Sequence, residues 1–164
     1  MLEGKRVAVV VPAFDEERLI GTTLSGIPDF VDRIIVVDDA SHDGTADAAR
    51  ATGDERVEVV THERNEGVGA AILTGYRRAL DDGIDVTCVM AGDNQMDPAD
   101  LEAIAGPVAR GEVDYVAQPR GHARRGRQEV GERHGVTRGA TGHAQGRPLA
   151  SCGRCSRPPP VSAI

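Results

Sequence analysis

The sequence predicts an α/β fold with a doubly wound, mostly parallel β-sheet, and two observations lead to this class. Short apolar runs recur at residues 7–11, 34–37, 57–60 and 86–90, with the length and composition of strands that are buried on both faces. Segments with apolar residues at helical spacing lie between these runs. Strands that alternate with helices form βαβ units, and such units build parallel sheets with helices on their faces.

The first two strands each end in a polar turn that precedes a helix. Pro12 closes the first apolar run, and the acidic residues from Asp15 onward open a predicted helix. The apolar positions that recur at helical spacing in this helix are Leu19, Ile20, Leu24 and Ile27. The second strand closes in the polar stretch 38–45, and a short helix is expected at residues 46–51.

A glycine-containing turn follows the third strand. It begins at Asn65 and Gly67 and leads into a longer helix. The predicted apolar face of this helix consists of Val68, Ile72, Gly75 and Ala79.

The stretch from residue 86 to residue 98 combines a strand, a polar turn and a helix start. Its apolar run breaks at Ala91 and Gly92, where small residues let a backbone or a ligand come close. The oxygen-bearing side chains that follow are Asp93, Asn94, Gln95 and Asp97. Asp97 is expected as the N-cap of a helix and Pro98 as its first residue. The apolar residues of that helix are Leu101, Ile104, Ala105 and Val108, and residues 114–116 begin a predicted fifth strand.

The charge pattern argues against one class of partner and divides the chain in two. The formal net charge is −7, which disfavours nucleic acid as a partner. Residues 1–115 carry 10 Lys and Arg against 24 Asp and Glu, whereas residues 116–164 carry 9 Arg and 2 Glu. No apolar run reaches the roughly 18 residues of a membrane span, and the apolar N-terminus is too short for a signal peptide. We therefore expect a cytoplasmic protein.

The pattern of strands and helices stops near residue 117. Residues 117–164 contain 9 Arg, 8 Gly and 5 Pro and have no aromatic residue. They are expected to be disordered, because they bury too little apolar surface to offset the entropy of ordering. A basic RNA-binding tail is the functional alternative. Cys152 and Cys155 form half of a zinc motif and lack a second well-spaced pair.

Polar side chains follow every predicted strand of the first 115 residues. They are Asp15, Glu16, Asp38, Asp39, Asn65, Asp93 and Gln95. The carboxyl ends of parallel strands meet at one edge of a sheet, where ligands bind. Clustered carboxylates repel one another unless a cation offsets their charge, so this edge predicts Mg²⁺ or Mn²⁺ carrying phosphates. The structural alternative is that each acidic residue only caps a helix.

Three other phosphate-binding motifs fit the sequence poorly. Gly67 and Gly69 begin a Gly-x-Gly-x-x-Gly pattern, but Ile72 stands where the third glycine is needed. The chain has no Gly-Lys-Ser/Thr sequence, which excludes a P-loop. Residues 42–45 resemble the motif of haloacid-dehalogenase phosphatases, but Ser41 occupies the position of the nucleophilic aspartate.

Four ordered motifs resemble those of family 2 glycosyltransferases. They are VVVPAFDEE at 9–17, VVDDASHDGT at 36–45, NEGVGAAILTG at 65–75 and MAGDNQMDP at 90–98. Their order and spacing most resemble the branch of polyprenyl-phosphate (dolichol-phosphate) mannose and glucose synthases. The resemblance covers about residues 5–116. It implies a Rossmann-like GT-A fold for a domain 1–116 that is followed by the tail 117–164.

The resemblance also implies a nucleotide-sugar site. Pro12, Phe14 and Glu16 would line the nucleotide pocket, and Val37 and Asp39 would lie at the base and ribose. Ala91, Gly92 and Asp93 would complete the nucleotide-sugar site.

Asp93 is the implied catalytic residue and metal ligand. Gln95 would help it to hold Mg²⁺ or Mn²⁺, which would bridge the diphosphate and stabilise the charge of the leaving group. Family members often have Asp-x-Asp where this chain has Ala91-Gly92-Asp93, so one usual carboxylate is missing.

The implied reaction is transfer of a sugar from a GDP- or UDP-sugar to an acceptor such as a polyprenyl phosphate, by a protein that is cytoplasmic or peripheral to the membrane. A non-catalytic nucleotide-sugar-binding fragment, and a phosphatase-like or dinucleotide-binding domain, are the alternatives. Family members hold their acceptor with residues beyond the fourth motif and usually have Gly-Asn-Arg where this chain has residues 117–120, Ala-Gln-Pro-Arg. If Gln-Pro were encoded as CAA-CCG, these codons would contain AAC-CG, the start of Asn-Arg, one base along, so we expect a frameshift or a gene fragment after residue 116.

Overall fold

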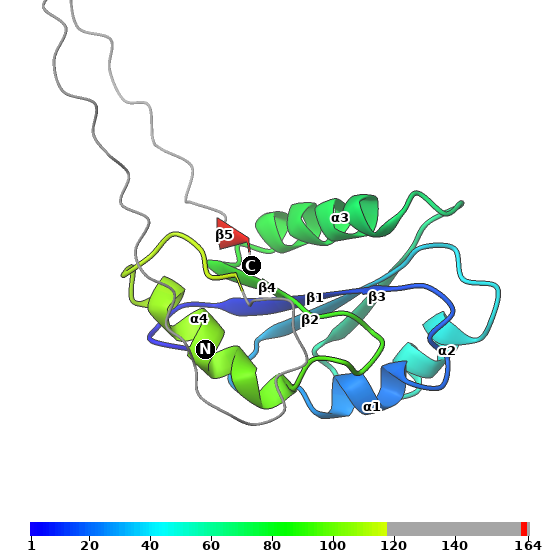
Figure 1. Cartoon of the computed structure of the whole chain (residues 1–164), viewed down its shortest axis with the longest axis horizontal. Coiled ribbons are helices and arrows are strands. Elements are labelled where there is room, and N and C mark those ends of the chain that lie inside the picture. The colour runs from blue at the N-terminus through cyan, green and yellow to red at the C-terminus, as the bar shows by residue number, and fades with distance from the viewer. Residues whose placement is uncertain (118–161, 164) are drawn as a thin grey trace, which may run out of the picture. The chain divides into compact units, whose positions relative to one another are not determined.

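The computed structural model describes residues 1–117 and 162–163, which form a parallel β-sheet with helices on both faces (Figure 1). Strand β1 (Val7–Ala13) lies between β2 (Arg33–Asp38) and β4 (Val86–Val89). Strand β3 (Val57–Thr61) lies beyond β2, and β5 (Ser162–Ala163) lies beyond β4. Every strand pair is parallel, which confirms the fold class predicted from the sequence.

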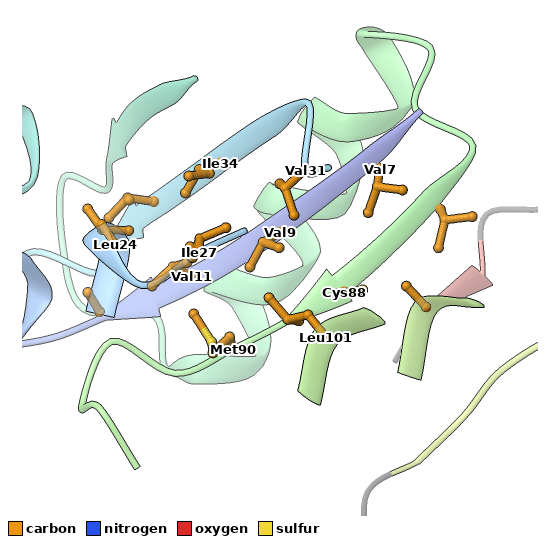
Figure 2. Packing of buried hydrophobic residues seen from close by; sticks show 14 of the residues in the cluster. Val7, Val9, Val11, Leu24, Ile27, Val31, Ile34, Cys88, Met90 and Leu101 are labelled. Carbon is orange, nitrogen blue, oxygen red and sulfur yellow. The ribbon is translucent and has the colours of Figure 1, made fainter. Parts of the chain in front are cut away.

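Strand β1 supplies the core on both faces of the sheet, because successive side chains of a strand point to opposite sides. All seven of its residues are buried. Val7, Val9 and Val11 join the larger core cluster, where they pack with Leu24 and Met90 (Figure 2). Ala8 and Val10 join the smaller cluster on the other face. Each buried valine contributes roughly 1.5–3 kcal/mol, so β1 anchors both layers of helices.

The helices divide unequally between the two faces (Figure 1). Helices α1 (Ile20–Ser25), α2 (Thr45–Arg50) and α4 (Leu101–Ala109) cover one face. The four apolar positions predicted for the last of these helices, Leu101, Ile104, Ala105 and Val108, are buried as expected. A short 3₁₀ segment, η1 (Pro98–Asp100), precedes α4. Asp97 caps it by accepting a hydrogen bond from the Ala99 amide at 3.0 Å, which confirms the predicted helix start.

Helix α3 (Val68–Asp81) covers the opposite face alone within the described part of the chain. It packs through Ala71, Gly75 and Ala79, and its backbone lies close to β1 at Gly75. A Cβ placed on Gly75 would lie 2.2 Å from Val10 Cγ1, so any side chain there would collide with β1. Val68, predicted for the same face, is 66 % exposed, so that part of the predicted apolar face is wrong.

The predicted start of the first helix at Asp15 is wrong, because α1 begins only at Ile20. Residues 15–17 instead form a loop whose backbone amides donate to side chains of the loop after β2 and of the first residue of α2. Asp15 N–H donates to Ser41 Oγ at 3.0 Å, and Glu16 N–H donates to Thr45 Oγ1 at 2.8 Å. Asp15 also has a φ of 55°, which a right-handed helix does not allow. The loops after β1 and β2 are therefore joined to each other.

The predicted fifth strand at residues 114–116 is also absent from the structure. Residues 115–117 have no regular secondary structure, and the edge of β4 pairs instead with β5. The expected tail lies almost wholly outside the described residues, and so do the disorder, RNA-binding and zinc hypotheses that concern residues 118–161.

A half-buried ring of ion pairs holds the sheet to α3 at the edge where the strands begin. Arg33 pairs with Glu58 at 3.1 Å and with Asp82 at 3.3 Å. Arg78 pairs with the same two carboxylates, at 2.7 Å and 3.2 Å. These four residues join β2, β3 and the end of α3, at the edge opposite the polar strand ends.

Candidate nucleotide-binding site

The polar residues predicted to converge do lie at one edge of the sheet, where β1, β2 and β4 end. The loops leaving these strands contain backbone conformations that side chains disfavour. Asp15, Ala40 and Asn94 have φ values of 55°, 59° and 56°. Each lies in the left-handed region, where a residue other than glycine is uncommon. The left-handed backbone conformations and the polar side chains therefore lie at the same edge of the sheet.

A cavity of about 130 Å³ opens between the ends of β1 and β2 and the start of α3. Three residues predicted for the nucleotide pocket, Pro12, Phe14 and Asp39, line it together. Val68 lines it as well, and so does Asn65, which was predicted for the polar edge of the sheet but not for the nucleotide pocket. The glycines of the turn after β3 were the available signal for them, because such a turn places backbone and small side chains beside a ligand.

Asp39 is buried at the wall of this cavity and is held by three donors. Its Oδ1 accepts hydrogen bonds from His62 Nδ1 at 2.7 Å and from the Glu66 amide at 2.9 Å. Its Oδ2 accepts one from the Gly67 amide at 2.7 Å. Burial opposes ionisation of Asp39, but these hydrogen bonds outweigh it and lower the pKa of the carboxyl below its usual value. Asp39 is therefore ionised at neutral pH and fixes the turn after β3.

A second, acidic cavity of about 470 Å³ is lined by the β1–α1 loop together with Asp43. Glu16, a predicted pocket residue, lies here and not in the smaller cavity. Burial raises the pKa of Glu16, and the negative charges of Asp93, Asp43 and Asp15 raise it further. The structure thus brings Glu16 close enough to Asp93 for the two carboxylates to repel each other.

Asp93 is half-buried in the turn after β4. Its Oδ1 accepts a hydrogen bond from the Gln95 amide at 3.0 Å, which closes the turn, while Gln95 itself is exposed. Residues 1–117 and 162–163 contain no group of three His, Cys, Asp or Glu side chains arranged to hold a metal. A divalent ion bound to a diphosphate needs only one or two protein carboxylates, because phosphate oxygens and water supply its other ligands. Asp93 with Glu16 nearby fits that requirement.

Two of the predicted site residues, Val37 and Gly92, are buried, which limits their contact with a ligand. The Val37 side chain is completely buried in the core beneath α3. Gly92 is buried too, and a Cβ there would lie 3.1 Å from Ile20 Cδ1 and 3.3 Å from Ala13 Cβ. The small size of Gly92 thus serves packing between β1 and α1. Ala91 is half-buried between this glycine and the core residue Met90.

The model of the family "Glycosyl transferase family 2" matches residues 8–153 of this chain. The chain belongs to this glycosyltransferase family. Membership decides against the phosphatase-like and dinucleotide-binding alternatives. The matched range continues past residue 116, so the predicted domain boundary there stays a prediction.

Relatives of this glycosyltransferase chain include enzymes named for lipid-phosphate acceptors. It is 28 % identical over 134 residues to a UDP-N-acetylglucosamine–dolichyl-phosphate N-acetylglucosaminyltransferase of Methanococcus voltae, covering 73 % of this chain and 53 % of the relative. It is 37 % identical over 100 residues to an undecaprenyl-phosphate mannosyltransferase of Micrococcus luteus, covering 58 % of this chain and 41 % of the relative. The chain therefore spans about half the length of these relatives, or less.

A solved glycosyltransferase shares the fold. Glucosyl-3-phosphoglycerate synthase of Mycobacterium tuberculosis, crystallised with Mn²⁺, UDP-glucose and phosphoglyceric acid, matches with a TM-score of 0.55 and 29 % identity. The match covers 66 % of this chain and 41 % of the synthase. The glycosyltransferase domain described here is accordingly an α/β domain of the Rossmann-like GT-A type.

Proposed function

We propose that this chain binds a nucleotide-diphosphate sugar and provides the donor side of a metal-assisted glycosyl transfer to a polyprenyl phosphate. The observation that carries the proposal is the adjacency of two features at one sheet edge. A small cavity lined by Pro12, Phe14 and Asp39 lies there, and so do the mutually repelling carboxylates Glu16 and Asp93. The names of the relatives support the lipid-phosphate acceptor.

The cavity suits the nucleoside part of the donor. Phe14 is partly exposed on its rim and packs edge-on against the His42 ring, with the ring centroids 5.6 Å apart. Pro12 and Ala71 supply apolar walls, and Asp39 supplies an ionised carboxylate that accepts hydrogen bonds. A flat heterocycle with N–H groups and an attached ribose matches such walls.

The acidic side of the edge suits the diphosphate only when a cation is present, because bare carboxylates repel phosphate. Asp93 would hold Mg²⁺ or Mn²⁺, with Glu16 beside it and Gln95 within the same turn. The bound ion would offset the charge that develops on the leaving diphosphate. Asp93 is fixed for this role by the hydrogen bond from the Gln95 amide, which leaves its Oδ2 available.

The chemistry of transfer is compatible with the lipid-phosphate acceptor that the names of the relatives support. A phosphate monoester attacks as an anion, so it needs no general base, whereas a hydroxyl acceptor does. A lipid acceptor would bring the protein to the membrane surface as a peripheral protein. In the part of the chain that the structure describes, none of the helices is long and apolar enough to cross a bilayer.

Calorimetric titration of the purified chain with UDP-glucose and with GDP-mannose, each with and without Mn²⁺, tests the proposal. We expect metal-dependent binding that Asp93→Ala abolishes. Asp97→Ala is the matched control, because Asp97 lies in the same turn region and caps η1 through the Ala99 amide. Equal loss of metal-dependent binding in both variants would contradict the role given to Asp93. Binding without transfer to a polyprenyl phosphate would instead identify a non-catalytic nucleotide-sugar-binding fragment.

A further inference from the structure

A hydrogen-bonded network of three side chains, of which Asp39 is buried and His62 and Thr74 are half-buried, lies behind the smaller cavity. His62, the first residue after β3, has its Nδ1 2.7 Å from Asp39 Oδ1 and its Nε2 2.9 Å from Thr74 Oγ1 on α3. The Asp39 and His62 side chains are 4 % and 11 % exposed. Because an ionised carboxylate only accepts hydrogen bonds, His62 Nδ1 carries the proton that bonds to Asp39.

The hydrogen-bonded network connects three elements that form the cavity. Asp39 follows β2, His62 follows β3, and Thr74 lies one turn of α3 beyond the cavity residue Ala71. The His62 backbone amide donates a hydrogen bond of 2.9 Å to the Asp38 carbonyl. This bond fixes the position of the His62 backbone, from which the imidazole extends.

The same network of side chains also holds the backbone of the turn between β3 and α3 through hydrogen bonds. Asp39 accepts from the Glu66 and Gly67 amides while His62 holds its Oδ1. Gly67 has a φ of 88°, which glycine adopts without steric cost, and its amide donates to Asp39 Oδ2 at 2.7 Å and to Asn65 Oδ1 at 3.1 Å. Gly67 and its neighbour Val68 line the cavity. Rotation of the Asp39 carboxylate would therefore move the cavity wall.

We propose that His62 and Thr74 are positioning residues of the donor site: they lock the Asp39 carboxylate, which in turn sets the Asn65–Gly67 turn against the nucleoside. This inference rests on the proposed function, because it assigns the residues to the nucleotide cavity. An imidazole suits the task because its two nitrogens bond to opposite sides with little freedom. An asparagine in its place keeps one donor near Asp39 but does not reach Thr74.

Nucleotide affinity of the full 164-residue chain tests the inference, with UDP and GDP as probes in the presence of Mn²⁺. His62→Ala is expected to raise Kd about tenfold, the effect of one hydrogen bond to a charged group. Thr74→Val is expected to raise it about threefold, as for a neutral hydrogen bond. Thr74→Ser keeps the hydroxyl and should restore the affinity of the unaltered chain. Ala79→Gly is the matched control, because it weakens α3 at the end away from the cavity.

Amide hydrogen exchange provides a readout that needs no nucleotide. His62→Ala and His62→Asn should both accelerate exchange at Glu66 and Gly67, more strongly in the alanine variant, while exchange along β1 stays slow. A role in global stability alone would instead accelerate exchange at all of these sites together, and Ala79→Gly would do the same.

The outcomes separate this inference from the proposed function. If the unaltered chain binds neither nucleotide, the proposed function fails and the inference fails with it. If it binds and His62→Ala and Thr74→Val bind within twofold of it, only the inference is overturned. A loss of affinity in Ala79→Gly equal to that in His62→Ala would also overturn it. Weaker binding in Thr74→Val with recovery in Thr74→Ser supports it.

Discussion

Replacement of Gly75 by alanine tests the packing of α3 on the sheet. Its Cβ would lie 2.2 Å from Val10 Cγ1 and 2.8 Å from Val10 Cγ2, whereas carbon atoms in contact are normally about 3.5–4.0 Å apart. Val10 is completely buried on the central strand and has no room to withdraw. Overpacking of this severity costs up to about 3 kcal/mol, and alanine returns about 1 kcal/mol of helix propensity. We expect a net loss of about 2 kcal/mol in the free energy of unfolding.

Urea unfolding followed by far-UV circular dichroism measures this loss. Gly69→Ala is the matched control, because it lies in the same helix with nothing within 4 Å of the added Cβ. It should be neutral or stabilising by up to about 1 kcal/mol. Adding Val10→Ala to Gly75→Ala should cost less than the two changes separately, because each makes room for the other. A Gly75→Ala variant as stable as Gly69→Ala would refute the packing of α3 on Val10.

Three further predictions concern the site and the tail. The pKa of Glu16 is raised above its ordinary value of 4.5, so the charged carboxylate destabilises the folded state at neutral pH. This cost is absent in acid, where Glu16 is protonated in both the folded and the unfolded state. Glu16→Gln should therefore raise the melting temperature at neutral pH and raise it less below pH 4.5. Saturating Mn²⁺ should reduce this increase in melting temperature. An equal increase at both pH values would contradict the prediction. Asp97→Ala should lower the free energy of unfolding by about 1 kcal/mol, measured in urea, through the lost cap. Restoring the alternative reading frame after Val116 should increase transfer to a radiolabelled polyprenyl phosphate; equal turnover by the 164-residue chain would show that its own residues after 116 hold the acceptor.

The strands were predictable because buried parallel strands consist of uninterrupted apolar runs, as in β1 and β2. Helix α4 was predictable because Asp97, which caps the η1 turn directly before it, and the buried stripe of α4 both lie within one local stretch. The start of α1 was not, since Asp15 to Glu17 bond to Ser41, Asp43 and Thr45, which are distant in sequence. No local pattern contains that information.

The site was predictable to a similar degree. Pro12, Phe14 and Asp39 were identified by motif and do line one cavity. The contribution of His62 was missed, because a single histidine after a strand has no periodic or motif signal. Its role depends on Thr74, twelve residues away, and on the register that sets β3 beside β2.

The left-handed backbone at Asp15, Ala40 and Asn94 has a consequence for protein engineering. Left-handed conformations cost side-chain-bearing residues roughly 1 kcal/mol or more each, and here the densely packed sheet compensates for them. Ala40→Gly therefore relieves this strain and raises heat resistance to the extent that the relief exceeds the added entropy of the unfolded chain, about 0.4–1 kcal/mol. The same change would loosen the loop beside Asp39, so thermostability gained there would be expected to come with weaker donor affinity. Stabilising substitutions in the core or on the outer face of α3 avoid that trade-off.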